Sequence, residues 1–310
     1  AIVTIQNRYN IIFIISDDQR WDTMQYMPLI NSRLGNESVK FSNAFVSTAL
    51  CCPSRSSILT GLYAHNHGLY FNNEPNGGAL EFDDSSTVAT WLKYTGYRTS
   101  LIGKYLNQYR KISPQIPPGW DDWHVFINET YYNYTLNENN VLNVYGASPS
   151  DYSTDVLSAI AINFISTTPQ NQSFFLYFAP FAPHFPYTPA PTDVNSLAGI
   201  APWRPPSYNE ANVSDKPLWV RQLPLLNASG SANGDIVRQM QLESLQAIDR
   251  GISGILDVLN QTGRLNNTII VYMSDNGYMW GEHRILDEKI CAYEECYRVP
   301  LWIRMPGVAG

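Results

Sequence analysis

Continuous apolar runs, each followed by a polar loop, recur along the chain. Three of them are residues 10–16, 173–179 and 268–274. Runs of this length without polar alternation are typical of strands buried on both faces of a parallel sheet. Two more strands are predicted at 96–106 and 299–303, and helical periodicity marks residues 86–94, 151–165 and 235–259. The pattern predicts an α/β fold with a mostly parallel central sheet flanked by helices.

The stretch from residue 190 to 233 has no periodicity and is rich in Pro, Asn and Ser, so it is predicted to be a long surface excursion. The chain has 310 residues, enough for a sizeable core. Its formal net charge of −7 argues against a nucleic-acid partner but leaves room for a local basic pocket around one anionic group. No apolar run approaches the roughly 20 residues of a membrane span, so none is expected.

Acidic and amide side chains directly follow two of the predicted strands. Asp17 and Asp18 follow the first run, and Asp275 and Asn276 follow the third. Parallel sheets place their ligands at the carboxyl ends of strands. Adjacent carboxylates repel each other unless a cation lies between them, and Ca²⁺ suits an all-oxygen site. The two strand ends therefore predict one shared cation site. For Asp17 and Asp18 alone, a solvated loop or a helix cap is the alternative.

A short helix is predicted to begin at Cys51. Pro53 suits the first turn of a helix, and Gly61 suits the residue just past its end. Free backbone N–H groups and the positive end of the helix dipole would then lie beside Cys51, and such a place binds a tetrahedral anion. Arg55, one turn further on the same face, adds a fixed cation. The alternative is a structural cysteine pair, Cys51 and Cys52, buried at a helix start.

The Cys-x-Pro-Ser-Arg stretch that begins at Cys51, with Thr-Gly after it, resembles the signature of the sulfatase family. In that family this cysteine is oxidised after synthesis to formylglycine (3-oxoalanine), the catalytic aldehyde. The resemblance implies the alkaline-phosphatase-like sulfatase fold. It implies one Ca²⁺ held by Asp17, Asp18, Asp275, Asn276 and position Cys51 itself. It also implies a formylglycine-generating enzyme as partner during maturation.

Other positions match sulfatase motifs outside the signature. The Gly-Lys-Tyr stretch at Lys104 is similar to the second signature, whose lysine grips a sulfate oxygen. Lys289 matches the family's second sulfate-binding lysine. His184, in a Pro-His motif after a predicted strand, matches the histidine that contacts the bridging ester oxygen and protonates the leaving alcohol. Together with Cys51 and Arg55, these residues form the expected catalytic set.

The form Lys-Tyr-Leu-Asn at 104–107 and the aromatic stretch 131–135 resemble the N-acetylglucosamine-6-sulfatase branch of the family. A sulfated sugar such as N-acetylglucosamine 6-sulfate is therefore the expected substrate. Aromatic segments 117–123 and 131–135 are expected to form loops and hairpins over the site, with core packing as the alternative. Many sulfatases have a histidine where this chain has Leu106, which leaves open the base for breakdown of the sulfated intermediate.

Three histidines near these motifs are weaker candidates. His65 and His67 follow the signature, and His283 lies six residues before Lys289. A direct chemical role is one interpretation of His65 and His67, and hydrogen-bonding support for the signature helix is the other. His283 matches a histidine that is frequent in this loop of the family.

Other functions compete with a sugar sulfatase. A broad-range arylsulfatase, acting on aryl sulfates, is the nearest. A non-catalytic relative that binds sulfate esters is possible if Cys51 is never oxidised. A phosphoesterase of the related alkaline-phosphatase architecture would use an unmodified Ser or Thr and commonly two metals, whereas the carboxylates here suffice for one site and the signature carries Cys.

Eight Asn-x-Ser/Thr sequons favour a secreted or lysosomal glycoprotein. The remaining two cysteines, Cys291 and Cys296, are five residues apart and are compatible with a disulfide or with free thiols. No signal peptide is visible at Ala1, which indicates a mature or trimmed form. The resemblance covers nearly the whole chain as one sulfatase catalytic domain, residues 1–310. Because sulfatases usually continue further, we expect a truncation before their C-terminal subdomain.

Overall fold

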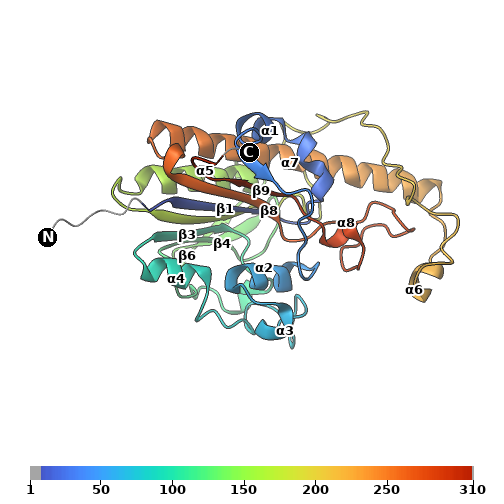
Figure 1. Ribbon diagram of the computed structural model, residues 1–310, viewed down its shortest axis with the longest axis horizontal. Helices are drawn as coiled ribbons and strands as arrows, with labels where there is room; N and C mark the ends of the chain where they lie inside the picture. The colour runs from blue at the N-terminus through green and yellow to red at the C-terminus, as the bar shows by residue number, and fades with distance from the viewer. Residues whose placement is uncertain (1–7, 309–310) are drawn as a thin grey trace.

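A nine-stranded mixed sheet runs through the centre of residues 8–308, the part of the chain that the computed structural model describes (Figure 1). Ala1 lies outside that part. In spatial order the strands are β2 (Ser38–Lys40), β9 (Leu301–Arg304), β8 (Thr268–Ser274), β1 (Asn10–Ser16), β7 (Phe174–Ala179), β3 (Arg98–Gly103), β4 (Asp122–Phe126), β5 (Tyr134–Glu138) and β6 (Val141–Tyr145). The five central strands, from β8 to β4, are parallel, and the two strands at each edge are antiparallel. The predicted mostly parallel α/β sheet is confirmed.

Helices cover both faces of the sheet, with α1, α5 and α7 on one side and α2, α3 and α4 on the other (Figure 1). The helices are α1 (Pro28–Arg33), α2 (Cys51–Thr60), α3 (Ala64–His67), α4 (Val88–Tyr94), α5 (Ser153–Thr167), α6 (Leu218–Arg221), α7 (Ala228–Gln261) and α8 (Glu294–Tyr297). Short 3-10 helices occupy Trp21–Tyr26, Tyr109–Lys111, Pro149–Asp151 and Leu265–Asn267. No helix in the described range is long and apolar enough to cross a membrane.

The central strands contribute side chains to two hydrophobic cores, one on each face of the sheet. In β7, Phe174 and Leu176 pack into the core under α5 and α7, whereas Phe175 and Tyr177 pack into the core under α2 and α4. Alternate side chains of a strand point to opposite faces, so a strand covered on both sides must be apolar throughout. This double burial explains why the apolar runs identified these strands.

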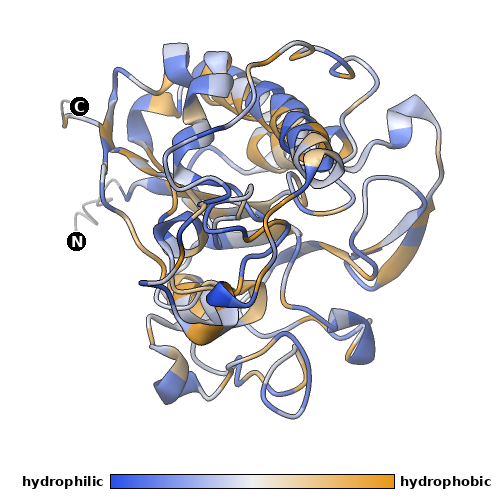
Figure 2. Cartoon of the chain, turned by 90° about the vertical axis from the view of Figure 1, so that its right-hand side faces the viewer, coloured by the Kyte–Doolittle hydropathy of each residue, from blue (hydrophilic) through white to orange (hydrophobic). Residues whose placement is uncertain are grey.

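The long helix α7 begins earlier than predicted, at Ala228 rather than at residue 235, and so takes the last residues of the expected surface excursion. Its first turns, Ala-Ser-Gly-Ser-Ala-Asn-Gly, contain weak helix formers and no apolar periodicity, which hid them in the sequence. The Asn227 side chain caps the helix by accepting a hydrogen bond from Gly230 N at 2.8 Å. Further along, α7 is amphipathic, and hydrophilic and hydrophobic residues alternate along its coil in Figure 2.

The aromatic segments expected over the site lie mainly in the cores, so core packing was the better interpretation. Trp123 and Tyr134 are completely buried, and Trp120 is nearly so. Strand β4 carries Trp123 into the core under α2, where its indole N–H donates to Tyr109 Oη at 2.9 Å. Residues 134–138 form β5, paired with β6 at the edge of the sheet. Tyr131 alone reaches the site, since its hydroxyl donates to the backbone carbonyl of His184 at 2.8 Å.

At this sheet edge, His124 lies between two carboxylates and should make stability depend on pH. Its ring nitrogens contact Asp122 at 3.2 Å and Glu138 at 3.1 Å. Burial alone would lower the pKa of His124, but these two hydrogen bonds raise it to about 9. Because the folded pKa exceeds the unfolded value, the stabilisation is complete below about pH 6.5 and is lost as pH rises through about 9. The shift corresponds to about 3 kcal/mol.

We therefore expect the free energy of unfolding, measured in urea at pH 6 and pH 9.5, to fall across this interval in the wild-type chain. His124→Gln should remove most of that fall, whereas His65→Gln, which alters an exposed histidine, should keep it. An equal pH dependence in the wild type and in His124→Gln would contradict the assignment.

Candidate active site

The polar residues that follow the central strands meet at one edge of the sheet. Strands β1 and β8 pair in register, Ser16 with Ser274, so the residues after them emerge side by side. The backbone N–H of Asp18 donates to Asp275 Oδ1 at 3.1 Å. The backbone N–H of Asp17 donates to the Ala182 carbonyl at 3.1 Å, which ties the loop of His184 to the same edge. Parallel pairing thus brings together residues that are far apart in the sequence.

Helix α2 begins at this edge with Cys51 as its first residue. Leu50 precedes the helix in an extended conformation, and Gly61 ends it with φ of +71°. Pro53 lies in the first turn, as predicted. Cys51 is completely buried, so its side chain is enclosed by the groups it contacts. The predicted helix is confirmed, with Cys51 at its amino end.

The Cys51 thiol is surrounded by ionisable groups. Lys289 Nζ donates to Sγ at 3.0 Å, and Asp17 Oδ1 lies 3.6 Å from Sγ. Burial raises the pKa of Cys51 to about 12, although Lys104 and Lys289 act to lower it. The unmodified side chain is therefore a neutral thiol at physiological pH, which makes it a poor nucleophile.

Buried cations pair with the three carboxylates around Cys51. Lys104 Nζ contacts Asp17 Oδ2 at 2.5 Å, and Arg55 Nε contacts Asp275 Oδ2 at 2.7 Å. Burial would raise the pKa of Asp17, but the nearby cations, with Lys104 first, hold it well below its usual range. Burial and the charge of Asp17 raise the pKa of Asp275 to about 6. The same surroundings thus lower the pKa of Asp17 and raise the pKa of Asp275.

Lys289 and His184 complete the cluster from two loops. Lys289 Nζ contacts both carboxylate oxygens of Asp18, at 2.7 and 2.9 Å. His184 Nε2 lies 3.6 Å from Asp18 Oδ2, at the partly exposed rim of the site. The other ring nitrogen, Nδ1, lies 2.9 Å from the carbonyl of Phe185. Because a carbonyl only accepts, Nδ1 carries the hydrogen, and Nε2 is the ring nitrogen that faces Asp18.

The carboxylate oxygens of this cluster are ligands that a hard dication prefers. Ligand atoms of Asp17, Asp18, Cys51 and His184 all lie within 4.8 Å of one another. Asn276 Nδ2 donates to Asp18 Oδ1 at 2.8 Å, whereas Asn276 Oδ1 is buried with no hydrogen-bond partner among the described residues. A cation bound between the carboxylates would satisfy this buried acceptor.

The protein-family model described as Sulfatase matches residues 9–310. The chain belongs to the sulfatase family. It is 34% identical over 314 residues to the extracellular sulfatase SULF-1 homolog of Drosophila melanogaster, covering 98% of this chain and 28% of that protein. It is 34% identical over 317 residues to human N-acetylglucosamine-6-sulfatase, covering 97% of this chain and 57% of that protein. This sulfatase chain therefore spans little more than half of the latter.

Among solved structures, the sulfatase chain is similar to BT4656 in complex with its substrate D-glucosamine-2-N,6-O-disulfate. The TM-score is 0.77 at 25% identity, and the match covers 96% of this chain and 71% of that one. This neighbour confirms the expected alkaline-phosphatase-like sulfatase fold.

The three weaker histidine candidates of this sulfatase lie outside the cluster. His67 Nε2 lies 3.0 Å from Ser57 Oγ of α2, and His67 Nδ1 accepts from Leu69 N, so this histidine braces the signature helix. The exposed His65 stacks on Tyr63. His283 contacts Glu210 at 3.1 Å. Support for the helix was thus the better interpretation of His67.

The sulfatase site also contains residues that the sequence did not reveal. Glu129, in the loop after β4, lies near enough to Lys104, Asp17 and His184 for their charges to act on it, and burial raises its pKa. Asp287 accepts hydrogen bonds from the hydroxyls of Tyr187 and Tyr278. No sequence motif marks Glu129. Asp287 lies two residues before Lys289, but no local pattern distinguishes it from a surface carboxylate.

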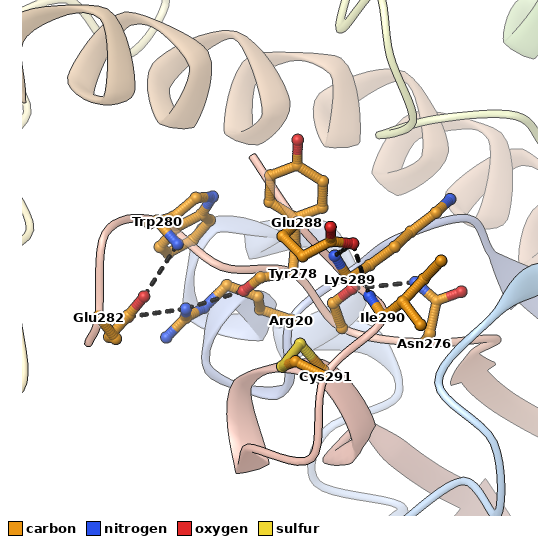
Figure 3. The surroundings of a disulfide bond; sticks show 11 residues. Arg20, Asn276, Tyr278, Trp280, Glu282, Glu288, Lys289, Ile290 and Cys291 are labelled. Atoms are coloured by element: carbon orange, nitrogen blue, oxygen red, sulfur yellow. Dashed lines mark hydrogen bonds and ion pairs between the residues drawn. A yellow bond between two sulfur atoms is a disulfide. The ribbon is translucent and has the colours of Figure 1, made fainter. Parts of the chain in front are cut away.

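The loop that carries Lys289 is held on both sides. Glu288 Oε1 accepts from the backbone N–H groups of Lys289 and Ile290, each at 2.8 Å. Directly after it, Cys291 and Cys296 form a disulfide, which resolves the alternative left open by the sequence. Figure 3 shows Lys289 and Ile290 leaving this loop beside the disulfide, with Asn276 next to them. Local hydrogen bonds and a covalent bridge thus restrain Lys289.

Proposed function

We propose that this chain forms the catalytic centre of a formylglycine-dependent sulfatase that hydrolyses a sulfate monoester of a sugar, with N-acetylglucosamine 6-sulfate as the expected substrate. The observation that carries the proposal is the position of Cys51, at the amino end of α2 and within 3.6 Å of both Lys289 Nζ and Asp17 Oδ1. The similarity to the human N-acetylglucosamine-6-sulfatase supports the choice of substrate.

Oxidation of Cys51 to formylglycine would convert an inert side chain into the reactive group. A neutral buried thiol attacks a sulfate ester poorly, because the ester is already anionic. A hydrated aldehyde at this position would supply one hydroxyl to attack sulfur as the bond from sulfur to the sugar oxygen breaks, and a second hydroxyl whose deprotonation would expel sulfate and restore the aldehyde. A formylglycine-generating enzyme is the partner that this maturation requires.

Two lysines bind the sulfuryl oxygens and neutralise their charge. Lys104 and Lys289 both lie within contact distance of the carboxylates around Cys51, so their ammonium groups point to one centre. Arg55 is paired with Asp275 and holds that carboxylate in place. Cations fixed before the substrate arrives stabilise charge that develops in the transition state without reorganisation.

The residues that would hold Ca²⁺ are Asp17, Asp18, Asp275 and Asn276, with the oxidised side chain at position 51 as a further ligand. When bound, the ion would supply positive charge at the sulfate oxygens and would make the attacking hydroxyl more acidic. Lys289 also pairs with Asp18, so this carboxylate contacts a positive charge in the structure without the ion. One ion suffices for these four residues, in keeping with a single-metal site.

The proposed function is tested by the ester that the chain cleaves and by the mass of the Cys51 peptide. The chain should release sulfate from N-acetylglucosamine 6-sulfate and from an aryl sulfate, and far less phosphate from the matched aryl phosphate. The active preparation should contain a Cys51 peptide about 18 Da lighter than the cysteine form. Faster phosphate release from an unmodified Cys51 chain would identify a phosphoesterase instead. Binding of the sulfated sugar without turnover would identify a non-catalytic relative.

His184 should act as the acid that protonates the departing alcohol. His184→Gln should lower kcat/KM for N-acetylglucosamine 6-sulfate by about 10²–10⁴-fold, because a sugar alkoxide leaves poorly without a proton. The same variant should lose less than about tenfold with 4-nitrophenyl sulfate, whose leaving group needs no acid. His65→Gln is the matched control and should leave kcat/KM unchanged for both substrates. Equal losses with both esters would assign His184 to binding rather than to proton transfer.

The proposal places this protein in the secretory pathway, as a secreted or lysosomal glycoprotein. All eight sequon asparagines are exposed; they are Asn36, Asn128, Asn133, Asn171, Asn212, Asn227, Asn260 and Asn266. Exposed sequons are accessible to N-glycosylation, and the Cys291–Cys296 disulfide fits an oxidising compartment. Expression with a secretion signal in a eukaryotic cell should yield a chain whose mass falls on treatment with peptide N-glycosidase.

A further inference from the structure

A hollow lies beside the active site and has no role in the chemistry described above. Its volume is about 450 Å³, within the range of about 300–1,000 Å³ typical of small-molecule sites. Its lining is mostly apolar and aromatic, with hydroxyl groups only on Thr48 and Tyr70. It consists of Thr48, Ala49, Leu50, Tyr70, Phe71, Trp219, Ile290, Cys291 and Ala292. None of these nine residues carries a charge, in contrast to the ionic cluster around Cys51.

Two walls of this hollow, which we term the aromatic pocket, continue directly from the active site. Leu50 is the residue before Cys51. Ile290 is the residue after Lys289, whose ammonium group lies 3.0 Å from Cys51 Sγ. A third wall is tied to the start of α2, because Asn72, next to Phe71, accepts a hydrogen bond from Cys52 N at 2.9 Å. The aromatic pocket is therefore adjacent to the reacting centre.

The exposed aromatic side chains of the pocket stand on fixed backbone. Trp219 is 48% exposed, yet its neighbour Val220 in α6 is completely buried in a small core with Met279 and Cys296. Phe71 is 56% exposed, and its backbone N–H donates to the Asn76 carbonyl at 3.0 Å. A Cβ atom at Gly77 would lie only 1.6 Å from the Phe71 carbonyl oxygen, so this turn requires glycine. Apolar side chains held rigidly in water are typical of a binding surface.

We propose that the aromatic pocket binds an uncharged sugar ring of the substrate, next to the scissile sulfate. This inference rests on the proposed function, and it narrows the expected substrates to sulfated sugars whose ring carries no second charge. The flat faces of Phe71 and Trp219 suit the apolar C–H face of a pyranose, and Thr48 offers a hydroxyl to its substituents. The pocket contains no cation to pair with a second anionic group, and an unpaired charge is costly to desolvate. The preferred ring therefore carries an N-acetyl or hydroxyl group rather than an N-sulfate or a carboxylate.

The first test compares two soluble substrates with the Cys51-oxidised chain. N-acetylglucosamine 6-sulfate should have a kcat/KM at least about tenfold higher than that of glucosamine-2-N,6-O-disulfate. Trp219→Arg should reverse or abolish this preference, because it adds a cation where the second anion would lie. A wild-type preference for the disulfated sugar would overturn the inference while leaving the proposed function intact.

The second test measures binding without turnover, so it does not depend on the activity. In the Cys51→Ala background, Trp219→Ala and Phe71→Ala should each weaken binding of N-acetylglucosamine 6-sulfate about tenfold by calorimetry. Trp91→Ala is the matched control, because Trp91 is also 48% exposed but lies on α4 outside the aromatic pocket. Equal affinities in the Trp219, Phe71 and Trp91 variants would overturn the inference. If these binding differences are found but the Cys51-oxidised chain releases no sulfate, the proposed function alone would be refuted.

Discussion

Cys51→Ala is expected to abolish multiple-turnover sulfate release, by at least about 10⁴-fold, and Cys51→Ser is expected to stall after one turnover. Alanine removes the nucleophile altogether. A serine hydroxyl has the geometry to attack sulfur, but it lacks the second hydroxyl whose deprotonation expels the product sulfate. Sulfate release should be followed over time, and the serine variant should be checked for a mass increase of about 80 Da on the peptide that contains residue 51.

The neighbouring cysteine provides the control for this prediction. Cys52 is also a free, completely buried thiol, and its sulfur accepts a hydrogen bond from Gly78 N at 3.3 Å. It packs in the core under α2 and faces away from the carboxylates. Cys52→Ala should therefore keep sulfate release within a few-fold and keep the lighter Cys51 peptide. Full multiple turnover in Cys51→Ala would remove the basis of the proposed mechanism.

The sequence predicted the central sheet and most of the residues at its edge, for a physical reason. A strand buried on both faces must be apolar, and the chain must become polar where that strand ends, so Asp17 and Asp275 were visible as the first charges after their runs. In-register parallel pairing of Ser16 with Ser274 then made their convergence a consequence of topology. The chemistry assigned to Cys51, by contrast, came from the family resemblance.

The remaining parts depended on contacts that leave no local pattern. Nothing near Glu129 distinguishes a loop glutamate beside the site from one in solvent, since only the packing of the loop after β4 decides this. The first turns of α7 lack apolar periodicity because they lie at the outer end of the helix, where the Asn227 cap stabilises them instead. Aromatic residues such as Trp123 and Tyr134 predict burial or binding equally well, and three-dimensional packing placed both in cores.

Removal of calcium is expected to cause the second large loss, in both activity and stability. Asp17, Asp18 and Asp275 share one buried cluster, and Asp18 adopts a left-handed φ of +68°, a conformation unusual for a residue other than glycine. Cations already pair with these carboxylates, but Asn276 Oδ1 still lacks a partner within the described residues. A bound ion would satisfy this oxygen and reduce the repulsion among the carboxylates.

A chelator should therefore lower sulfate release by at least about 10²-fold and lower the melting temperature, and added Ca²⁺ should restore both. At 100 times its dissociation constant, an ion that binds only the folded chain stabilises it by about 2.7 kcal/mol. Asp18→Asn should raise the Ca²⁺ concentration required for half-maximal activity by about 10²-fold. Asp83→Asn, which alters an exposed carboxylate, should leave it unchanged. If activity and melting temperature in excess chelator equal those in Ca²⁺, the cluster works through Lys104 and Lys289 alone.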